Sequence, residues 1–299
     1  MDSMTSARIV TMTDLEDGRL RPYRNLRERT LRGESLFIAE GPLVVERLLR
    51  SSFEVESLLM TRKSGLERCL ELVPSNVPIY EIPEHVAMNQ LVGFDFHQGV
   101  MAIGRRSALP TAQQGFEKFF TGEARRALDT ASLAKQPIAR RRRAWVVLPD
   151  ATKPDNLGLA FRCAAALDAE AVVLGEKCCD PFSRRALRVS MGGVLQTPVY
   201  QARNLREEIK LVRERWNVPF FATTLDEVAI SSYDHGVSVL AQRQYVAFVF
   251  GNEYSGLTAE TIALCDQSVK IPMHGDVDSL NLGVSVGIFL YEFNRWNAR

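Results

Sequence analysis

Three segments in the second half of the chain combine glycines with amide, hydroxyl and carboxylate side chains, and each follows a short apolar run. The residues that could do chemistry there are Asn156 and Arg162 in the first segment, Gly251 and Glu253 in the second, and Ile271, Ser279, Leu280 and Asn281 in the third. Ligand sites of open parallel sheets lie beyond the carboxyl ends of the strands. The three segments are therefore the places where a ligand site is expected.

Each segment also has a plain structural interpretation. Arg162 follows Gly158 by one helical turn and lies among apolar residues, which disfavours a purely solvated role. Glu253 follows a buried run, where ligand contacts are common, but a turn carboxylate has the same pattern. The third segment precedes an apolar helix, whose free N–H groups suit a ligand carrying a carboxylate or phosphate.

Several familiar sites are excluded by their spacing. Gly283–Gly287 fits the G-x-S-x-G pattern of a nucleophilic serine, but it lies inside a predicted helix and no histidine follows His274. Neither the dinucleotide-binding glycine pattern nor the P-loop pattern occurs, which argues against a dinucleotide dehydrogenase or a P-loop NTPase. Four histidines and five cysteines show no zinc spacing, so no metal is expected.

Hydrophobic patterning predicts the elements that must position these residues. In the second half, buried parallel strands are expected at 145–148, 171–174, 220–223, 245–250 and 269–271, with helices at 156–167, 183–189, 205–216, 258–264 and 280–296. In the first third, strands are expected at 36–39, 56–60, 78–82 and 99–103, with helices at 42–50, 65–72 and 84–91. The alternation indicates α/β architecture in both parts, with three layers in the first.

The length of 299 residues favours about two domains. We expect an α/β domain at about 20–106, a basic linker or insertion at 107–143, and a second α/β domain at 144–299. The middle segment loses the apolar rhythm and is punctuated by proline and glycine, although 116–120 and 125–134 could form short helices.

A net charge of +1 hides a strong gradient along the chain. Residues 105–143 carry ten Lys/Arg against three Asp/Glu, and residues 19–32 carry six arginines against one glutamate. Clustered cations attract a polyanion because neutralised phosphates release counterions. The candidate RNA contacts are Arg140, Arg141, Arg142, Arg143, Arg24 and Arg27. A solvated linker and a solvated helix face are the alternative interpretation.

Other sequence features bear on location. The longest stretch without a formal charge has 14 residues, too few for a membrane-spanning helix, and the N-terminus has no apolar signal region. The odd number of cysteines, with no C-x-x-C pair, suits a reducing compartment. A cytoplasmic location without membrane association is expected.

Taken together, the three segments resemble the ordered motifs of the SpoU-type (TrmH-like) RNA ribose 2′-O-methyltransferases of the SPOUT superfamily. The matching residues are Asn156-Leu157-Gly158 with Arg162, Phe250-Gly251-Asn252-Glu253 with Ser255-Gly256-Leu257, and Ile271-Pro272-Met273 with Ser279-Leu280-Asn281. The resemblance is strong over about 144–296. It extends more weakly to 20–106, through Phe37–Gly41 and His97–Val100.

The resemblance implies a parallel-sheet α/β trefoil-knot methyltransferase domain, preceded by a smaller α/β ribosomal-protein-like substrate-binding domain. It implies that S-adenosyl-L-methionine is bound at the knot loops and that the protein is a homodimer acting on RNA, more often ribosomal than transfer RNA. The residues expected to hold the methyl donor are Gly251, Ile271 and Leu280, with Thr223 and Leu225 as additions.

Three positions depart from the family pattern. Members commonly have an acid where Lys153 stands, a glycine where Tyr254 stands and a small residue where Asp168 stands. Lys153 could weaken a structural contact or add a phosphate contact. Tyr254 narrows the loop and could stack on a base.

The resemblance also implies a mechanism, in which a methyl group moves to a ribose 2′-hydroxyl. Arg162 is expected to orient that hydroxyl and the neighbouring phosphate, since its guanidinium stays protonated. Asn156, Ser279 and Asn281 would position groups, and Glu253 would brace Arg162 or the knot, or be purely structural. The alternatives are an RNA-binding protein that keeps the fold without turnover, and a methyltransferase acting on small molecules or proteins.

Overall fold

The structure is a computed structural model that describes residues 9–26, 33, 35–61, 70–83, 85–121, 143–226, 229–231, 245–274 and 279–295. The chain packs as two compact units. The first comprises Met1–Ala108 together with Pro181–Gln196, and the second comprises Leu109–Asp180 together with Thr197–Arg299. The two units are described separately below.

The first unit is built on a mixed sheet with the strand order β1-β4-β3-β5-β2 among its described residues. These strands are β1 (Ile9–Thr11), β2 (Leu36–Glu40), β3 (Val55–Thr61), β4 (Ile79–Ile82) and β5 (Val100–Arg105). The four strands predicted from the sequence are confirmed, and β1 was missed. Strand β5 runs antiparallel to both β2 and β3, so the sheet is not purely parallel.

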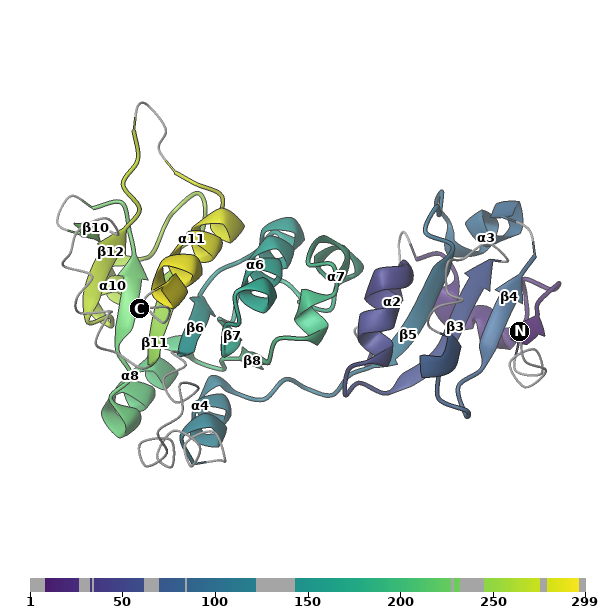
Figure 1. Cartoon of the computed structure of the whole chain (residues 1–299), viewed down its shortest axis with the longest axis horizontal. Coiled ribbons are helices and arrows are strands. Elements are labelled where there is room, and N and C mark those ends of the chain that lie inside the picture. The colour runs from purple at the N-terminus through teal and green to yellow at the C-terminus, as the bar shows by residue number, and fades with distance from the viewer. Residues whose placement is uncertain are drawn as a thin grey trace. The chain divides into compact units, whose positions relative to one another are not determined.

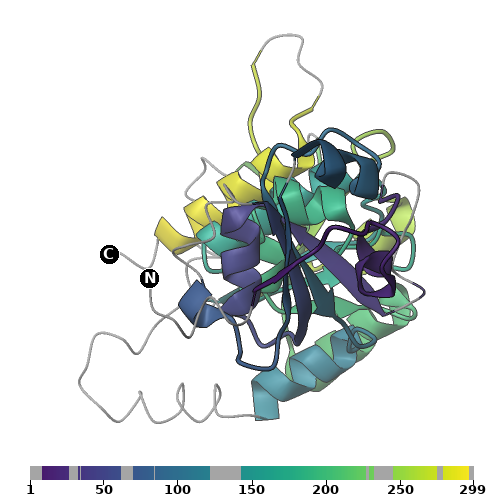
Figure 2. The same ribbon diagram turned by 90° about the vertical axis from the view of Figure 1, so that its right-hand side faces the viewer.

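Helices and turns cover this sheet. Helix α2 (Pro42–Leu49) packs against β2 and β5, as Figures 1 and 2 show. Helix α3 (His85–Val92) was also predicted. The helix predicted at 65–72 lies largely outside the described residues. Its last part, Leu70–Leu72, forms the short 3-10 turn η3. The core on the η1 (Gly18–Tyr23) side includes Tyr23, whose buried hydroxyl lies 2.8 Å from that of Ser57.

Helix α7 (Arg184–Val189) belongs to the first unit, although the sequence placed it within the C-terminal domain. The ring of Phe182, just before α7, lies 5.2 Å from that of Phe37 and 5.4 Å from that of Phe53. Arg184 also forms an ion pair of 3.4 Å with the buried carboxylate of Glu40. These contacts join segments more than 100 residues apart, which no local pattern reveals.

The second unit contains a parallel sheet with the order β10-β12-β9-β11-β6-β7-β8 among its described residues. The strands are β6 (Arg143–Leu148), β7 (Ala171–Leu174), β8 (Val199–Gln201), β9 (Phe220–Thr223), β10 (Ile230–Ser231), β11 (Tyr245–Phe250) and β12 (Gln267–Lys270). All five predicted strands are present. The short edge strands β8 and β10 were missed because they have too few residues for a pattern.

Helices lie on both faces of this sheet (Figure 1). The helices of this unit are α4 (Ala112–Thr121), α6 (Pro154–Ala166), α8 (Leu205–Trp216), α10 (Ala259–Ala263) and α11 (Leu282–Arg295). Alternate residues of β11 serve the two faces, because Val249 packs in the core with α4 and α8 while Phe248 contacts Phe289 of α11.

Helix α4 confirms the short helix expected at 116–120 within the segment 107–143, and it is longer than expected. Its Phe116 stacks on Trp145 with ring centroids 3.8 Å apart, and both rings are buried. The ring of Tyr200 stacks on the same indole, with the ring centroids 5.9 Å apart. The segment has too few apolar residues to predict a helix in the core, yet Phe116 and Phe119 of α4 both contact Trp145 of the sheet.

Helices α6 and α11 pack closely because glycine faces the contact. A Cβ atom at Gly283 would lie 2.4 Å from Cβ of Leu159, whereas one at Gly287 would lie 3.2 Å from Sγ of Cys163. This is the G-x-S-x-G segment, and it lies inside α11 as the sequence predicted. Asp168, just beyond the end of α6, has a φ of 55°, which explains why a small residue suits that position.

Candidate functional site

The first and second motifs meet through side chains. Asn156, in the first turn of α6, donates a hydrogen bond from its amide to the carboxylate of Glu253, in the loop after β11. Both side chains are half-buried. Two of the residues predicted from separate segments are therefore in direct contact.

The third motif joins the same network. Asn281 donates from Nδ2 to Oδ1 of Asn156 over 2.8 Å, and its own Oδ1 accepts from the backbone N–H of Gly283 at 2.9 Å. Asn281 thus holds the start of α11 against the start of α6. A continuous chain of hydrogen bonds runs from Glu253 through Asn156 to Asn281.

The loop after β11 is held in one conformation by its own residues. The backbone groups of Asn252 and Gly256 bond to each other in both directions, at 2.9 and 3.2 Å. Asn252 also donates from Nδ2 to the carbonyl oxygen of Asp150 at 3.0 Å. A Cβ atom at Gly251 would lie 2.5 Å from the backbone of Gly256, so only glycine fits there. Asn252 was missed as a structural residue, although its place beside Gly251 marks it.

A pocket of about 260 Å³ opens at the carboxyl ends of β9, β11 and β12. It is lined by Thr223, Thr224, Leu225, Phe250, Gly251, Asn252, Glu253, Tyr254, Gly256, Ile271, Met273, Ser279, Leu280, Leu282, Ser285 and Phe289. All five residues expected to hold the methyl donor line this one pocket, together with Glu253 and Ser279. The topology explains the convergence, since parallel strands present their carboxyl ends at one edge.

The pocket combines an apolar wall with a few polar groups. The rings of Phe250 and Phe289 lie 5.8 Å apart and supply apolar surface. Thr224 contributes a buried hydroxyl oxygen without a hydrogen-bond partner among the described residues, whereas the hydroxyl of Thr223 donates to the carbonyl of Val249 at 3.0 Å. A ligand with both apolar and polar parts suits such a site. Thr224 and Phe289 were not predicted from the sequence.

Arg162 stands apart from this pocket. It lies on α6, its side chain is exposed, and it is not among the lining residues. No ion pair or hydrogen bond of its guanidinium occurs among the described residues. Asn156 and Asn281 also lie outside the lining: Asn156 bonds to the lining residue Glu253, and Asn281 stands between the lining residues Leu280 and Leu282. The expected brace between Glu253 and Arg162 is absent from the described residues, because Glu253 pairs with Asn156.

Two residues that depart from the family pattern contact each other. The ammonium of Lys153 donates to the hydroxyl of Tyr254 at 2.5 Å and lies 4.3 Å from the centre of its ring. The hydrogen bond to Tyr254 raises the pKa of the Lys153 ammonium. Tyr254 lines the pocket, yet 81% of it is exposed.

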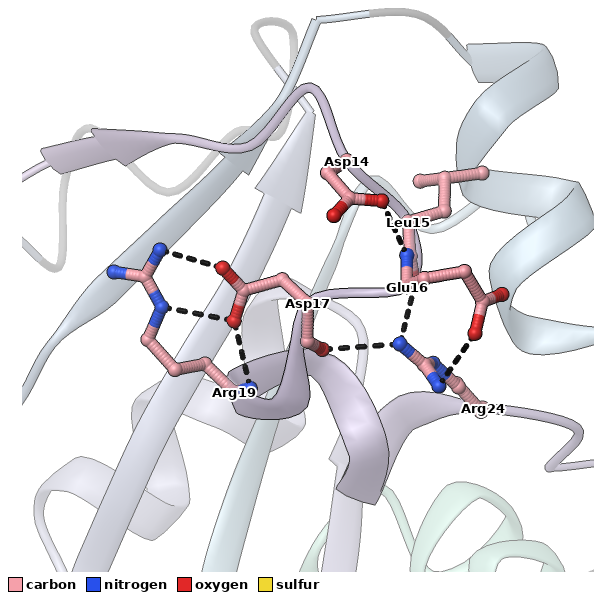
Figure 3. Close-up of polar contacts among 6 residues, drawn as sticks. All are labelled: Asp14, Leu15, Glu16, Asp17, Arg19 and Arg24. Atoms are coloured by element: carbon pink, nitrogen blue, oxygen red, sulfur yellow. Dashed lines mark hydrogen bonds and ion pairs between the residues drawn. The ribbon is translucent and has the colours of Figure 1, made fainter.

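In the first unit, Arg24 organises a turn (Figure 3). Its guanidinium donates to the carbonyl oxygens of Leu15 at 2.7 Å and Asp17 at 3.0 Å, and pairs with Glu16 at 3.0 Å. In the same turn, Arg19 pairs with the Asp17 carboxylate. The residue predicted to bind RNA therefore has a structural role that its arginine-rich segment did not reveal.

Arg143 begins β6 and pairs with Glu170 at 3.2 Å. Burial raises the pKa of the Glu170 carboxyl, and the Arg143 charge opposes that shift. The other RNA-contact candidates, Arg27 and Arg140–Arg142, lie outside the described residues.

Among the described residues, no group of three or more His, Cys, Asp or Glu side chains is placed to hold a metal ion. No described helix has the length and apolar composition needed to span a bilayer. Burial raises the pKa of the Cys178 thiol to about 11, so this cysteine is a protonated donor to the Leu148 carbonyl at 3.0 Å.

Comparison with known proteins matches residues 143–291 to the SpoU rRNA Methylase family. The chain is 32% identical to an "Uncharacterized tRNA/rRNA methyltransferase" of Mycobacterium tuberculosis, over 94% of this chain and 90% of that protein. It is 30% identical to the 23S rRNA (guanosine-2'-O-)-methyltransferase RlmB of Acinetobacter baylyi, over 83% and 92% of the two chains.

Solved structures resemble the chain over nearly its whole length. An AdoMet-bound rRNA methyltransferase from Sinorhizobium meliloti is similar with a TM-score of 0.72 at 25% identity, over 96% of this chain and 98% of that one. A structure described as an RNA 2'-O ribose methyltransferase is similar with a TM-score of 0.70 at 25% identity, over 97% and 100%.

Proposed function

Because the chain belongs to the SpoU family of S-adenosyl-L-methionine-dependent RNA methyltransferases, we propose that it methylates a ribose 2′-hydroxyl in ribosomal RNA. The observation that carries the proposal is the pocket at the carboxyl ends of β9, β11 and β12, with the Glu253–Asn156–Asn281 network at its edge. Two relatives are named as enzymes acting on 23S rRNA at guanosine 2'-O, which favours ribosomal over transfer RNA.

The residues of this pocket fit the methyl donor. Gly251, Ile271 and Leu280 would bind it through backbone groups, and the unpartnered hydroxyl of Thr224 offers a further hydrogen bond. The apolar wall, with Phe289, suits the parts of the donor that carry no polar atoms. When bound, S-adenosyl-L-methionine would supply an electrophilic methyl group: the ribose oxygen bonds to the methyl carbon as the carbon–sulfur bond breaks, which leaves a neutral thioether and releases the hydroxyl proton to solvent.

Arg162 would act on the acceptor and not on the donor. Its exposed guanidinium is free of partners among the described residues, so it can contact an incoming phosphate and the ribose hydroxyl. It stays protonated, which suits orientation of the hydroxyl and not removal of its proton. Glu253, Asn156 and Asn281 would fix the loop after β11 and the starts of α6 and α11 relative to one another. Ser279 would contribute a hydroxyl at the pocket wall.

The remaining expectations concern assembly. We propose a homodimer, supported by exposed apolar side chains on α11, where Val284 is 48% and Tyr291 58% exposed one heptad apart. The trefoil knot implied by the family resemblance would place α11 against α6, and the two helices do pack together. Four described cysteines are free thiols, which supports a cytoplasmic location.

We propose that RNA is bound by the auxiliary domain expected at about 20–106, which lies within the first unit, and by the basic segment at 107–143. Arg140–Arg143 and Arg27 would contact the phosphate backbone. Arg24 would contribute less, since its guanidinium already has three partners in its own turn. Replacing Arg140–Arg143 by serine should lower the slope of log Kd against log salt, because each lost phosphate contact contributes about 0.7 to 0.9 to that slope.

The test is a map of ribose 2′-O-methylation in total RNA from a strain with the gene deleted. We expect one 23S rRNA position to lose its methyl group, and the purified protein with S-adenosyl-L-methionine to restore it. Loss of a transfer RNA position instead would correct the substrate class.

Two further outcomes would reject the proposal. If no position changes while the protein still binds RNA, it is a binding protein without turnover. If methyl transfer from labelled donor into a cell extract survives RNase treatment, the acceptor is not RNA.

A further inference from the structure

Lys153 and Tyr254 form a pair at the mouth of the donor pocket, although 101 residues separate them in the chain. Each was singled out in the sequence as a departure from the family pattern. Their contact shows that the two departures are one feature of this molecule. It comprises an aromatic ring with a cation bonded to its hydroxyl, 4.3 Å from the ring centre.

The ring of Tyr254 is presented to solvent and not buried. It is 81% exposed, and its backbone N–H is tied to Oδ1 of Asn252 at 2.9 Å. Asn252 is in turn bonded to Gly256 within the loop and to the Asp150 carbonyl. An exposed aromatic on a constrained loop loses little conformational freedom on binding, which makes it an efficient contact surface.

The geometry leaves the faces of the ring available. Lys153 lies 2.5 Å from the Tyr254 hydroxyl and 4.3 Å from the ring centre, so its ammonium lies toward the hydroxyl edge of the ring. A face of this exposed ring can receive a flat π-system. The ammonium beside it can neutralise a phosphate, so one base and its backbone could be held by the pair together.

We propose that Tyr254 is a stacking platform for an unpaired base of the RNA next to the methylated ribose, and that Lys153 both positions the ring and contacts the phosphate of that nucleotide. This inference rests on the proposed RNA substrate and deepens it. Single-stranded RNA is commonly held by bases stacked on aromatic side chains, and stacking tolerates any base. The pair would therefore hold the splayed strand while Arg162 orients the acceptor.

The first experiment measures binding of the full-length protein by fluorescence anisotropy. The probes are a labelled ten-nucleotide oligoadenylate and an abasic ribose-phosphate strand of the same length and charge. Tyr254→Leu should weaken oligoadenylate binding about tenfold, in the range expected for one stacked base, and change binding of the abasic strand less than twofold. Tyr254→Phe keeps the ring and should bind the oligoadenylate within about threefold of the parent protein.

Lys153→Met separates charge from stacking. It should weaken both strands by a similar factor of about three and lower the salt slope by close to one counterion. Lys210→Met is the matched control, since Lys210 is an exposed lysine of α8 that pairs with Glu207 and has no contact with the pocket. It should change neither strand.

Three results would overturn the inference. Tyr254→Leu could leave both strands unchanged, or weaken both equally, and in either case no base stacks on the ring. It could instead raise the Kd for S-adenosyl-L-methionine and leave the binding of both strands unchanged, which would make Tyr254 part of the wall of the donor pocket.

These results are distinguishable from failure of the proposed function, because the binding assay needs no turnover. If the parent protein binds the oligoadenylate with a Tyr254-dependent gain but methylates no RNA, the platform stands and the proposed function fails.

Discussion

The amide of Asn156 donates a hydrogen bond to the carboxylate of Glu253, although 97 residues separate the two in the chain. Asn156 lies in the first turn of α6, which follows β6, and Glu253 follows β11. Strands β6 and β11 are neighbours in the sheet, so their carboxyl ends deliver the two side chains to the same edge. The bond fixes the loop after β11 relative to helix α6, which carries Arg162.

Asn156→Ala should lower kcat about 100-fold while changing the Kd for S-adenosyl-L-methionine by less than threefold, because misplacement of groups by about 1 Å costs that much rate. Asn156→Asp should be worse, since it puts a second carboxylate against Glu253. Repulsion between the two carboxylates should displace the loop after β11 from its position in the parent protein. Steady-state methylation between pH 6 and 8 is the measurement.

Asn204→Ala serves as the control for this pair of variants. Asn204 caps α8 through a side-chain bond to the N–H of Glu207 at 3.2 Å, away from the pocket. It should cost about 1 kcal/mol of stability and leave kcat unchanged. Equal activity of Asn156→Asp and Asn156→Ala at every pH would contradict a role for the Glu253 contact.

The pocket at the carboxyl ends of β9, β11 and β12 was within reach of sequence reasoning because strand ends are visible in a sequence. Gly251 and Ile271 directly follow apolar runs, and parallel topology brings such positions together. Thr224 and Phe289 were missed for different reasons. A threonine after a strand carries no special signal, and Phe289 looks like any core residue of an apolar helix.

Long-range contacts are what the sequence could not supply. The pair of Lys153 with Tyr254 and the pair of Arg184 with Glu40 each join distant segments, and neither partner has a pattern that names the other. The sequence predicts a short helix around Phe116, but it does not predict the stacking of that ring on Trp145, which places the helix in the core of the second unit.

Arg162→Ala is expected to abolish methyl transfer while leaving the fold intact. The side chain is exposed, so its removal should change the free energy of unfolding by no more than about 0.5 kcal/mol. Arg162→Lys keeps the charge but not the two-pronged geometry, and should retain only a small part of kcat. Arg206→Ala, at an exposed arginine of α8, is the control. Full activity of Arg162→Ala would refute the assignment of this residue to the acceptor.

Two glycines of α11 offer a graded test of its packing on α6. Gly283→Ala should destabilise the protein by about 1–3 kcal/mol, because its Cβ would lie 2.4 Å from Leu159. Gly287→Ala meets only the Sγ of Cys163 at 3.2 Å, so the gain of helix propensity, about 0.5–1 kcal/mol, should offset the contact. Urea unfolding followed by circular dichroism measures both. Equal effects of the two substitutions would show that helix packing does not depend on position 283.

The contacts of Asp17 predict how the stability of the first unit changes as the pH falls (Figure 3). Hydrogen bonds from the Arg19 guanidinium, at 2.7 and 3.0 Å, lower the pKa of this carboxyl to about 2 in the folded protein, below its ordinary value of 3.8. A lowered folded-state pKa means that the ionised carboxylate favours folding. That contribution is complete above about pH 4 and is lost as the pH falls through about 2.

The measurement compares the thermal unfolding midpoints of the parent protein and Asp17→Asn. Asparagine still accepts the hydrogen bond from the backbone N–H of Arg19, at 2.8 Å in the parent, and loses only the ion pair. The difference in midpoint should be constant from pH 7 to 5 and should shrink from pH 4 toward 2. Asp14→Asn is the matched control, since the Asp14 carboxylate accepts from the backbone N–H of Glu16 at 2.8 Å, a bond that asparagine can also accept. A difference that grows on acidification would have the wrong sign for a carboxylate stabilised by Arg19.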